Sequence, residues 1–248
     1  MGILSYIRHL QSCNSFRYKG RLYGIHRLDK VTSGILLFAK NSQTAGLISA
    51  KFRNKEVTKY YVAVSYSKPK KKKQGWIKGD MERTRRSMWK LTKSMKDPAI
   101  TRFYTAGLGG LYPIRDKKKD QEEEEGCRFA KTLILFQPHT GRTHQLRVAA
   151  KSIGLPILGD PYYATSTIKG ESNAKRTNGN ERTFLHAAAL HMNLNGKDIS
   201  IWSPPSFFQK GESPSENDAE EEGGGMIISS LGFHRIVVDT MKKYCDNK

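Results

Sequence analysis

The sequence has few cysteines, few acidic residues and no long apolar run. Its three cysteines, Cys13, Cys127 and Cys245, are far apart and odd in number, so they form neither a disulfide framework nor a zinc-binding spacing. No apolar run is long enough to span a bilayer, and the N-terminus lacks the apolar core of a secretory signal. These absences point away from secreted disulfide-stabilised proteins and membrane proteins, and they favour a protein of a reducing compartment.

The shortage of acidic residues gives the chain a strong positive charge. Against 23 Asp and Glu there are 43 Lys and Arg, for a formal net charge of +20 over 248 residues. Such an excess predicts binding to a polyanion rather than any particular fold. Aromatic residues interleave with the basic ones, which favours RNA or DNA over a membrane surface. These aromatic residues include Trp76, Trp89, Phe103 and Tyr104.

Residues 68–96 carry half of this charge. They contain twelve Lys or Arg and two acidic residues before Asp97, a net +10 out of +20. A solvated hairpin would account for the charge, and the run around Lys70–Lys73 also resembles a nuclear import signal. We favour contact with RNA phosphates, because Trp76 and Trp89 would be unfavourable on a surface that binds nothing.

A stretch near the start, residues 26–40, brings a carboxylate to the edge of an apolar segment. It reads His-Arg-Leu-Asp-Lys-Val-Thr-Ser-Gly followed by five apolar residues, 35–39, which predicts a buried strand entered from a polar loop. The neighbours Arg27 and Lys30 favour the ionised form of Asp29. An ionised carboxylate held there can attack a sugar or a base. The alternative is an aspartate that only caps a turn before the strand.

The remaining pattern predicts a chain rich in strands. Helical spacing covers 3–10, 43–53 with Asn41 or Ser42 as N-cap, and 143–153 with Thr143 as N-cap and Gly154 at its end. Strands are predicted over 57–65, 99–105 and 131–136, a short strand and tight turn over 156–163, and a hairpin of 184–194 and 199–202 around Asn195-Gly196. Residues 213–225 are predicted to be disordered, and 236–244 to form a terminal helix.

Other chemistries find little support. The pairs His139 with His144, and His186 with His191, lack a suitable third ligand, so no metal is expected. No serine lies in a nucleophile elbow. A glycosidase with two carboxylates would need a partner for Asp29. Asp160 is the only contender, and its Gly-Asp-Pro turn indicates a structural role.

Five motifs in order make the chain resemble the RluA family of RNA pseudouridine synthases. They are His26-Arg27-Leu28-Asp29 with Thr32-Ser33-Gly34; Lys59, Tyr61 and Ala63; Gly141-Arg142-Thr143-His144-Gln145-Leu146-Arg147; Gly154-x-Pro156-Ile157-x-Gly159-Asp160; and Leu185-His186-Ala187. The resemblance runs from about residue 24 to about residue 210. It implies an α+β domain with a mixed, largely antiparallel sheet, flanking helices and a central active-site cleft.

The resemblance also implies which residues do the chemistry, without cofactor or metal. Asp29 would be the nucleophile, attacking either C1′ of the ribose or C6 of the uracil. Tyr61 would pack its ring on the target base and is a candidate acceptor for the proton of C5. Arg147 would pair with Asp29 and keep it ionised.

Four further residues would bind the substrate. Arg27 would fill the gap left in the RNA when the uridine is flipped out. Leu146 would close an apolar wall, and Arg142 and His144 of the same motif are candidate substrate-binding residues. The expected partner is structured RNA, either rRNA or tRNA, and we expect a monomer that binds no membrane. An intracellular location is expected, with the cytoplasm favoured over the nucleus or mitochondrion.

The sequence departs from the family at several places. Before residue 26 we find neither the strand with an Asn-Lys-Pro-x-Gly motif nor an S4-type RNA-binding domain, and Ala149 stands where the family commonly has His. We therefore divide the chain into a leader, 1–25, which is either a shortened first part of the catalytic domain or a divergent replacement; a catalytic domain, 26–210; an acidic disordered segment, 211–225; and a C-terminal helix, 226–248.

Two other functions compete with the isomerase. A non-catalytic RNA-binding or ribosome-assembly factor would keep the fold without the activity; the missing strand favours it, while the presence of Asp29, Tyr61 and Arg147 argues against it. A hydrolytic N-glycosidase would use the same carboxylate but would release uracil and leave an abasic site.

Overall fold

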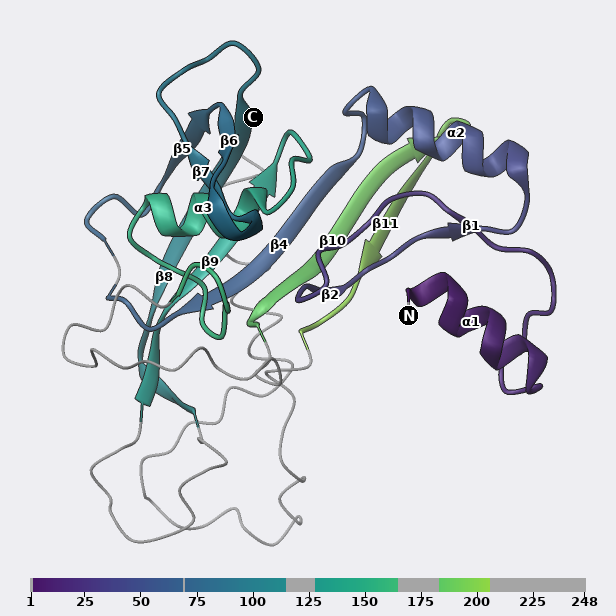
Figure 1. Ribbon diagram of the computed structural model, residues 1–248, viewed down its shortest axis with the longest axis horizontal. Helices are drawn as coiled ribbons and strands as arrows, with labels where there is room; N and C mark the ends of the chain where they lie inside the picture. The colour runs from purple at the N-terminus through teal and green to yellow at the C-terminus, as the bar shows by residue number, and fades with distance from the viewer. Residues whose placement is uncertain (1, 69, 115–127, 165–182, 206–248) are drawn as a thin grey trace, which may run out of the picture.

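A seven-stranded sheet forms the centre of the molecule. The structure, a computed structural model, describes residues 2–68, 70–114, 128–164 and 183–205 (Figure 1). The strand order is β11-β10-β4-β9-β8-β5, and β2 pairs with β10. Every pair is antiparallel except β2 with β10, which is parallel. The expected α+β class with a mixed, largely antiparallel sheet is confirmed.

The elements have the following bounds. The central sheet contains β2 (Ser33–Gly34), β4 (Thr58–Ser65), β5 (Gln74–Gly79), β8 (Ala99–Ile114), β9 (Arg128–Pro138), β10 (Leu185–Leu194) and β11 (Lys197–Trp202). Two small ribbons pair β1 (Tyr23–Gly24) with β3 (Phe38–Ala39), and β6 (Met81–Arg83) with β7 (Trp89–Leu91). The α-helices are α1 (Ile3–Ser12), α2 (Ser42–Arg53) and α3 (Gln145–Ser152), and Arg85–Ser87 form a 3-10 turn.

Strand β4 separates two apolar layers, because successive side chains of a strand point to opposite faces. Tyr60 and Val62 belong to one layer, with Leu133 and Leu135. Tyr61 packs against the other layer, with Ala63 of the same strand. The two adjacent tyrosines therefore face opposite sides, as the strand pattern predicts.

Helix α3 covers the face of the sheet that carries Tyr61. Its Leu146, Ala149 and Ala150 are buried in the same layer as Phe103 and Phe136. Figure 1 shows α3 and the β6–β7 ribbon lying over β8 and β9, and α2 lying across the far ends of β4 and β10. Asp29, in the loop between β1 and β2, lies 3.7 Å from Arg147 of α3, so this face carries the candidate site.

Local signals predicted several elements well. Helix α2 has Asn41 as its N-cap, whose Oδ1 accepts a hydrogen bond from the Thr44 N–H at 2.8 Å. The β10–β11 hairpin turns at Asn195 and Gly196, with φ angles of 53° and 79°. Both residues are therefore in the left-handed conformation that a tight type I′ turn requires.

Two predictions were wrong. The apolar run 35–39 is not one buried strand: only Phe38 and Ala39 form a strand, in the small ribbon with β1, and of the run only Ala39 is fully buried. The segment 156–163 forms turns and no strand.

The predicted disorder over 213–225 and the helix over 236–244 lie outside the described residues, and the central cleft and the domain boundaries stay predictions. No described helix is long and apolar enough to cross a membrane.

Candidate active site

The loop that carries Asp29 is held at its base by His26. The ring Nε2 of His26 accepts a hydrogen bond from the Leu37 N–H at 3.1 Å, and the ring stacks on Phe52 with centroids 4.8 Å apart. Burial lowers the pKa of His26, with a smaller effect from the charge of Lys59. A neutral ring is what the accepted hydrogen bond requires. His26 thus ties the two ends of the loop together.

A second anchor fixes the loop to the sheet. Ser33 and Gly34 pair in parallel with His186 and Ala187 of β10, and Ser33 Oγ lies 2.9 Å from Nδ1 of His186. Gly34 has a φ of 110°, and a Cβ there would lie 2.3 Å from the carbonyl oxygen of Ala187. Only glycine allows this approach. The Thr-Ser-Gly and Leu-His-Ala motifs, 153 residues apart, therefore form one contact.

Arg147 meets two carboxylates. Its Nε and Nη2 donate to Asp160 at 2.7 and 2.9 Å, while its Nη1 lies 3.7 Å from Oδ2 of Asp29. The side chains of Arg147 and Asp160 are 2% and 0% exposed, and that of Asp29 is 21% exposed. Arg147 is thus clamped from behind by Asp160 and faces Asp29 at the surface.

The charges of this trio stabilise the guanidinium. Burial by itself disfavours the charged form, but the hydrogen bonds and charge of Asp160, and then the charge of Asp29, raise the pKa of Arg147 above its ordinary value. Asp160 also accepts hydrogen bonds from the N–H groups of Tyr162 and Tyr163 at 2.9 and 3.0 Å. The structural role expected for Asp160 is therefore to position Arg147.

Tyr61 enters the site from β4. Burial, and then the negative charge of Asp29, raise the pKa of Tyr61 to about 12. Its hydroxyl is therefore protonated at neutral pH. Three segments distant in the sequence, the loop with Asp29, strand β4 and helix α3, bring the three predicted catalytic side chains together.

Helix α3 does not begin as predicted. Its N-cap is His144, not Thr143, and His144 adopts the left-handed conformation with φ 58° and no side-chain cap. The side chain of Gln145 bends back instead: its Oε1 accepts from the Arg142 N–H at 2.9 Å and from the Thr140 hydroxyl at 2.8 Å. This turn leaves no capping position for Thr143.

Gln145 also fastens the turn to β8. Its Nε2 donates to the carbonyl of Ile100 and the hydroxyl of Thr101, at 3.1 and 2.9 Å. The residue is 6% exposed, so all of these groups need partners. Sequence reasoning assigned Gln145 no role; a polar amide between Thr-His and an apolar helical face was the signal that could have found it.

The four predicted substrate-binding residues do not all lie at the site. Leu146 is buried in the layer that Tyr61 packs against. Arg27 is exposed, and its charge helps lower the pKa of His144, so the two lie near each other. Arg142 points elsewhere, because its guanidinium pairs with Asp97. Arg27, Leu146 and His144 therefore lie at the site, whereas the side chain of Arg142 is paired with Asp97 outside it.

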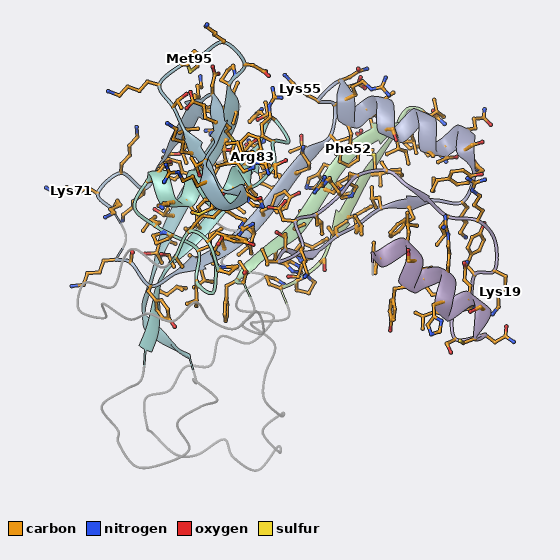
Figure 2. All side chains as sticks on the ribbon, in the orientation of Figure 1. Lys19, Phe52, Lys55, Lys71, Arg83 and Met95 are labelled. Atoms are coloured by element: carbon orange, nitrogen blue, oxygen red, sulfur yellow. The ribbon has the colours of Figure 1, made fainter. Side chains whose placement is uncertain are left out.

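The basic segment 68–96 contains strands β5, β6 and β7. On edge strand β5, Trp76 is 47% exposed, with Lys78 Nζ 5.2 Å and Arg102 Cζ 5.6 Å from its ring centroid. Figure 2 shows Lys71 pointing away from the molecule and Arg83 on the β6–β7 ribbon. The segment thus offers exposed cations around an exposed ring. Trp89, by contrast, is partly buried, and its backbone N–H donates to the hydroxyl of Tyr163.

Comparison with known proteins gives one consistent answer. The family described as RNA pseudouridylate synthase matches residues 8–152. A protein of Haemophilus influenzae named as an uncharacterized RNA pseudouridine synthase is 40% identical over 189 residues, which cover 76% of this chain and 71% of that protein. The ribosomal large subunit pseudouridine synthase C of Rickettsia felis is 34% identical over 194 residues, 77% of this chain.

The chain is shorter than these relatives, and spans only 56% of the Rickettsia enzyme. Among solved structures, the human RNA pseudouridylate synthase domain containing 1 superposes with a TM-score of 0.59 and 25% sequence identity. The superposition covers 80% of this chain and 74% of the human one.

Proposed function

The chain belongs to the RNA pseudouridylate synthase family of the RluA type and isomerises uridine to pseudouridine in RNA; we propose that it does so with Asp29 as nucleophile. The observation that carries the assignment is the division of Arg147 between two carboxylates. Asp160 takes the hydrogen bonds, and Asp29 lies at 3.7 Å, beyond hydrogen-bonding range of the guanidinium. Arg147 therefore turns its positive charge toward Asp29 without donating a hydrogen bond to it.

The reaction moves one bond and one proton. Attack by Asp29 at C1′ of the ribose displaces N1 of the uracil directly, whereas attack at C6 adds to the C5–C6 double bond and the bond between N1 and C1′ breaks in the next step. The base turns, a bond forms between C5 and C1′, C5 loses its proton, and N1 gains one. The carboxylate is released at the end, so the reaction needs no cofactor or metal.

Tyr61 contributes its ring more than its hydroxyl. With a pKa of about 12, only about one molecule in 10⁵ carries a tyrosinate at pH 7, so the phenol is a poor acceptor for the C5 proton. Its ring packs on the layer that includes Leu146, and these two side chains supply an apolar support for the base. Arg27, exposed and two residues from Asp29, is placed to enter the gap in the RNA.

The substrate class we propose is structured RNA, either rRNA or tRNA, bound by a monomer. The name of the Rickettsia relative makes large-subunit rRNA the first RNA to test. The purified chain is incubated with RNA carrying tritium at C5 of uridine, and tritium release is measured together with the sites of pseudouridine. Wild type releases tritium, Asp29→Ala releases none and still binds RNA, and Asp198→Ala, an exposed aspartate of β11, behaves as wild type.

Each competing function predicts another outcome. A non-catalytic RNA-binding factor binds RNA but releases no tritium in any variant. An N-glycosidase yields free uracil and abasic sites instead of pseudouridine. Pseudouridine formation by Asp29→Ala at the wild-type rate would rule out Asp29 as nucleophile.

The basic segment provides a prediction about RNA binding. Replacing the four lysines 70–73 by glutamine should weaken binding and reduce the magnitude of the slope of log K against log salt by up to about 3.6, because each phosphate contact contributes roughly 0.7 to 0.9. Filter binding at several salt concentrations measures this slope. Lys197→Gln, on the opposite edge strand β11, is the control. An unchanged slope would exclude this loop from the RNA path.

A further inference from the structure

His144 is held in an unfavourable backbone conformation beside Asp29 and Arg147. A left-handed conformation costs a non-glycine residue roughly 1 kcal/mol, so contacts have to maintain it. The ring lies nearly parallel to that of Tyr162, with centroids 6.1 Å apart, and edge-on to that of Tyr163. The imidazole is therefore fixed between two tyrosines.

A chain of hydrogen bonds sets which ring nitrogen of His144 carries the proton. The backbone N–H of Trp89 donates to the hydroxyl oxygen of Tyr163 at 2.9 Å, and that oxygen lies 3.0 Å from Nδ1 of His144. Tyr163 is 1% exposed, so its single proton needs an acceptor within the protein. Among the described residues that acceptor is Nδ1, which leaves the proton of a neutral imidazole on Nε2.

The surroundings keep this imidazole neutral. Burial, and then the positive charge of Arg147, lower the pKa of His144, and Arg27 acts in the same direction. The carboxylates of Asp29 and Asp160 act in the opposite direction without cancelling the effect. In the part of the chain that the structure describes, no acceptor binds Nε2, so His144 carries one N–H donor with its tautomer fixed, close enough to Asp29 to feel its charge.

We propose that His144 donates its Nε2 proton to the O4 carbonyl of the target uracil, and that Tyr163 is the positioning residue that fixes this tautomer. The inference rests on the proposed function and adds to it the basis of base choice. Cytosine carries an amino group at C4. That group is a hydrogen-bond donor and cannot accept a hydrogen bond from Nε2 of His144. The site therefore selects uracil.

The same contact survives the reaction. The base turns about the axis through N3 and C6, which exchanges N1 with C5 and the C4 carbonyl with the C2 carbonyl. O2 of the product then occupies the place that O4 held in the substrate. A single donor can therefore hold the base before and after it turns, because uracil presents a carbonyl on either side of N3.

The tautomer is tested without any assay of activity. Nitrogen-15 NMR of the histidine rings of the full chain should show His144 neutral at pH 7 with its proton on Nε2. Tyr163→Phe, which removes the hydroxyl, should release this preference and populate the other tautomer. A wild-type ring protonated on Nδ1, or on both nitrogens, overturns the inference.

The contact with O4 is tested by pairing variants with an altered substrate. The mapped uridine is replaced by 4-thiouridine, whose sulfur accepts hydrogen bonds poorly. Wild type should lose about tenfold in rate, the value of one hydrogen bond of about 1.4 kcal/mol. His144→Phe should lose a similar factor on uridine and nothing further on 4-thiouridine. His144→Gln, which keeps an N–H donor, should lose less.

A matched control comes from His191, whose Nδ1 bonds Ser200 on β11. His191→Gln should match wild type on both substrates. If His144→Phe, which has no donor, keeps the full penalty for 4-thiouridine, the O4 contact is wrong while the isomerase assignment stands. If wild type forms no pseudouridine on any uridine substrate, the proposed function itself fails.

Discussion

Two aspartates face the same guanidinium in very different surroundings. Asp160 is fully buried and accepts four hydrogen bonds, two from Arg147 and two from backbone N–H groups. Asp29 is 21% exposed and lies 3.7 Å from Arg147. Both carboxylates are close to the same positive charge, but only one has its oxygen atoms committed to neighbours.

This difference suits Asp160 to positioning Arg147 and suits Asp29 to reacting with the substrate. A carboxylate whose lone pairs are saturated by donors is a poor nucleophile, and removing it leaves a buried charge without its partner. A carboxylate that lies near a cation, and whose oxygen atoms accept no hydrogen bond from the described residues, can instead attack an electrophilic carbon. We infer that Asp160 is important for stability and geometry, and that Asp29 is important for the chemistry.

The largest expected effect comes from exchanging each carboxylate for its amide. Asp29→Asn should abolish turnover and leave the free energy of unfolding nearly unchanged. Asp160→Asn should lower the free energy of unfolding by about 3 to 5 kcal/mol, because the buried Arg147 loses its counter-charge. Tritium release and urea unfolding of the two variants measure the contrast. Equal stability losses in both variants would abolish the distinction between them.

Arg147→Lys should give the next largest effect. The ammonium keeps the charge but cannot make the two parallel hydrogen bonds to Asp160 and still face Asp29. We expect a fall in kcat of about 10- to 100-fold, the scale of a misplaced catalytic group, with a smaller change in KM. Steady-state kinetics on the mapped RNA measure kcat and KM separately. A variant with wild-type kcat would show that the bidentate geometry is unimportant.

Tyr61→Phe should have a smaller effect, because the ring remains. We expect a rate loss of less than about tenfold. The difference in ultraviolet absorbance between wild type and variant, followed as the pH is raised, should show the Tyr61 tyrosinate forming near pH 12. The raised pKa means that its contribution to stability is present below pH 10 and is lost as the pH rises from about 10 to about 12. Complete loss of activity in this variant would instead make the hydroxyl essential.

Ser33→Ala should have the smallest effect. It removes the contact of Ser33 Oγ with His186 Nδ1 and its longer hydrogen bond to the Leu185 carbonyl, together worth about 1 kcal/mol, while the backbone pairing of the loop remains. Urea unfolding should register this loss, and kcat should fall only slightly. Gly34→Ala serves as the severe counterpart, since its new Cβ would meet the backbone of Ala187.

Much of this arrangement follows from local sequence signals. The alternation in β4 placed Tyr60 and Tyr61 on opposite faces, and Asn195-Gly196 marked the last hairpin. Family motifs identified Asp29 and Arg147, which the structure places at the distance of an ion pair. These signals act within a few residues or come from patterns specific enough to carry over.

Interactions between distant segments could not be predicted in the same way. The first turn of α3 is shaped by Gln145, whose side chain reaches β8 and so displaces Thr143 from the capping position. The apolar run 35–39 looks like one core strand, but only its last two residues pair with another strand, β1, while Ile35 and Leu37 pack on the core without forming a strand. Tertiary contacts override local propensity in both places.

The parallel pairing of Ser33–Gly34 with β10 also has a consequence for the timing of synthesis. Ser33 and His186 are 153 residues apart, so a ribosome adding about 5 to 20 residues per second makes the second partner roughly 8 to 30 s after the first. Through that interval the nascent polypeptide contains Asp29, the proposed nucleophile, but lacks the strand on which the loop of Asp29 docks. The loop can therefore take its final position only after β10 has been made.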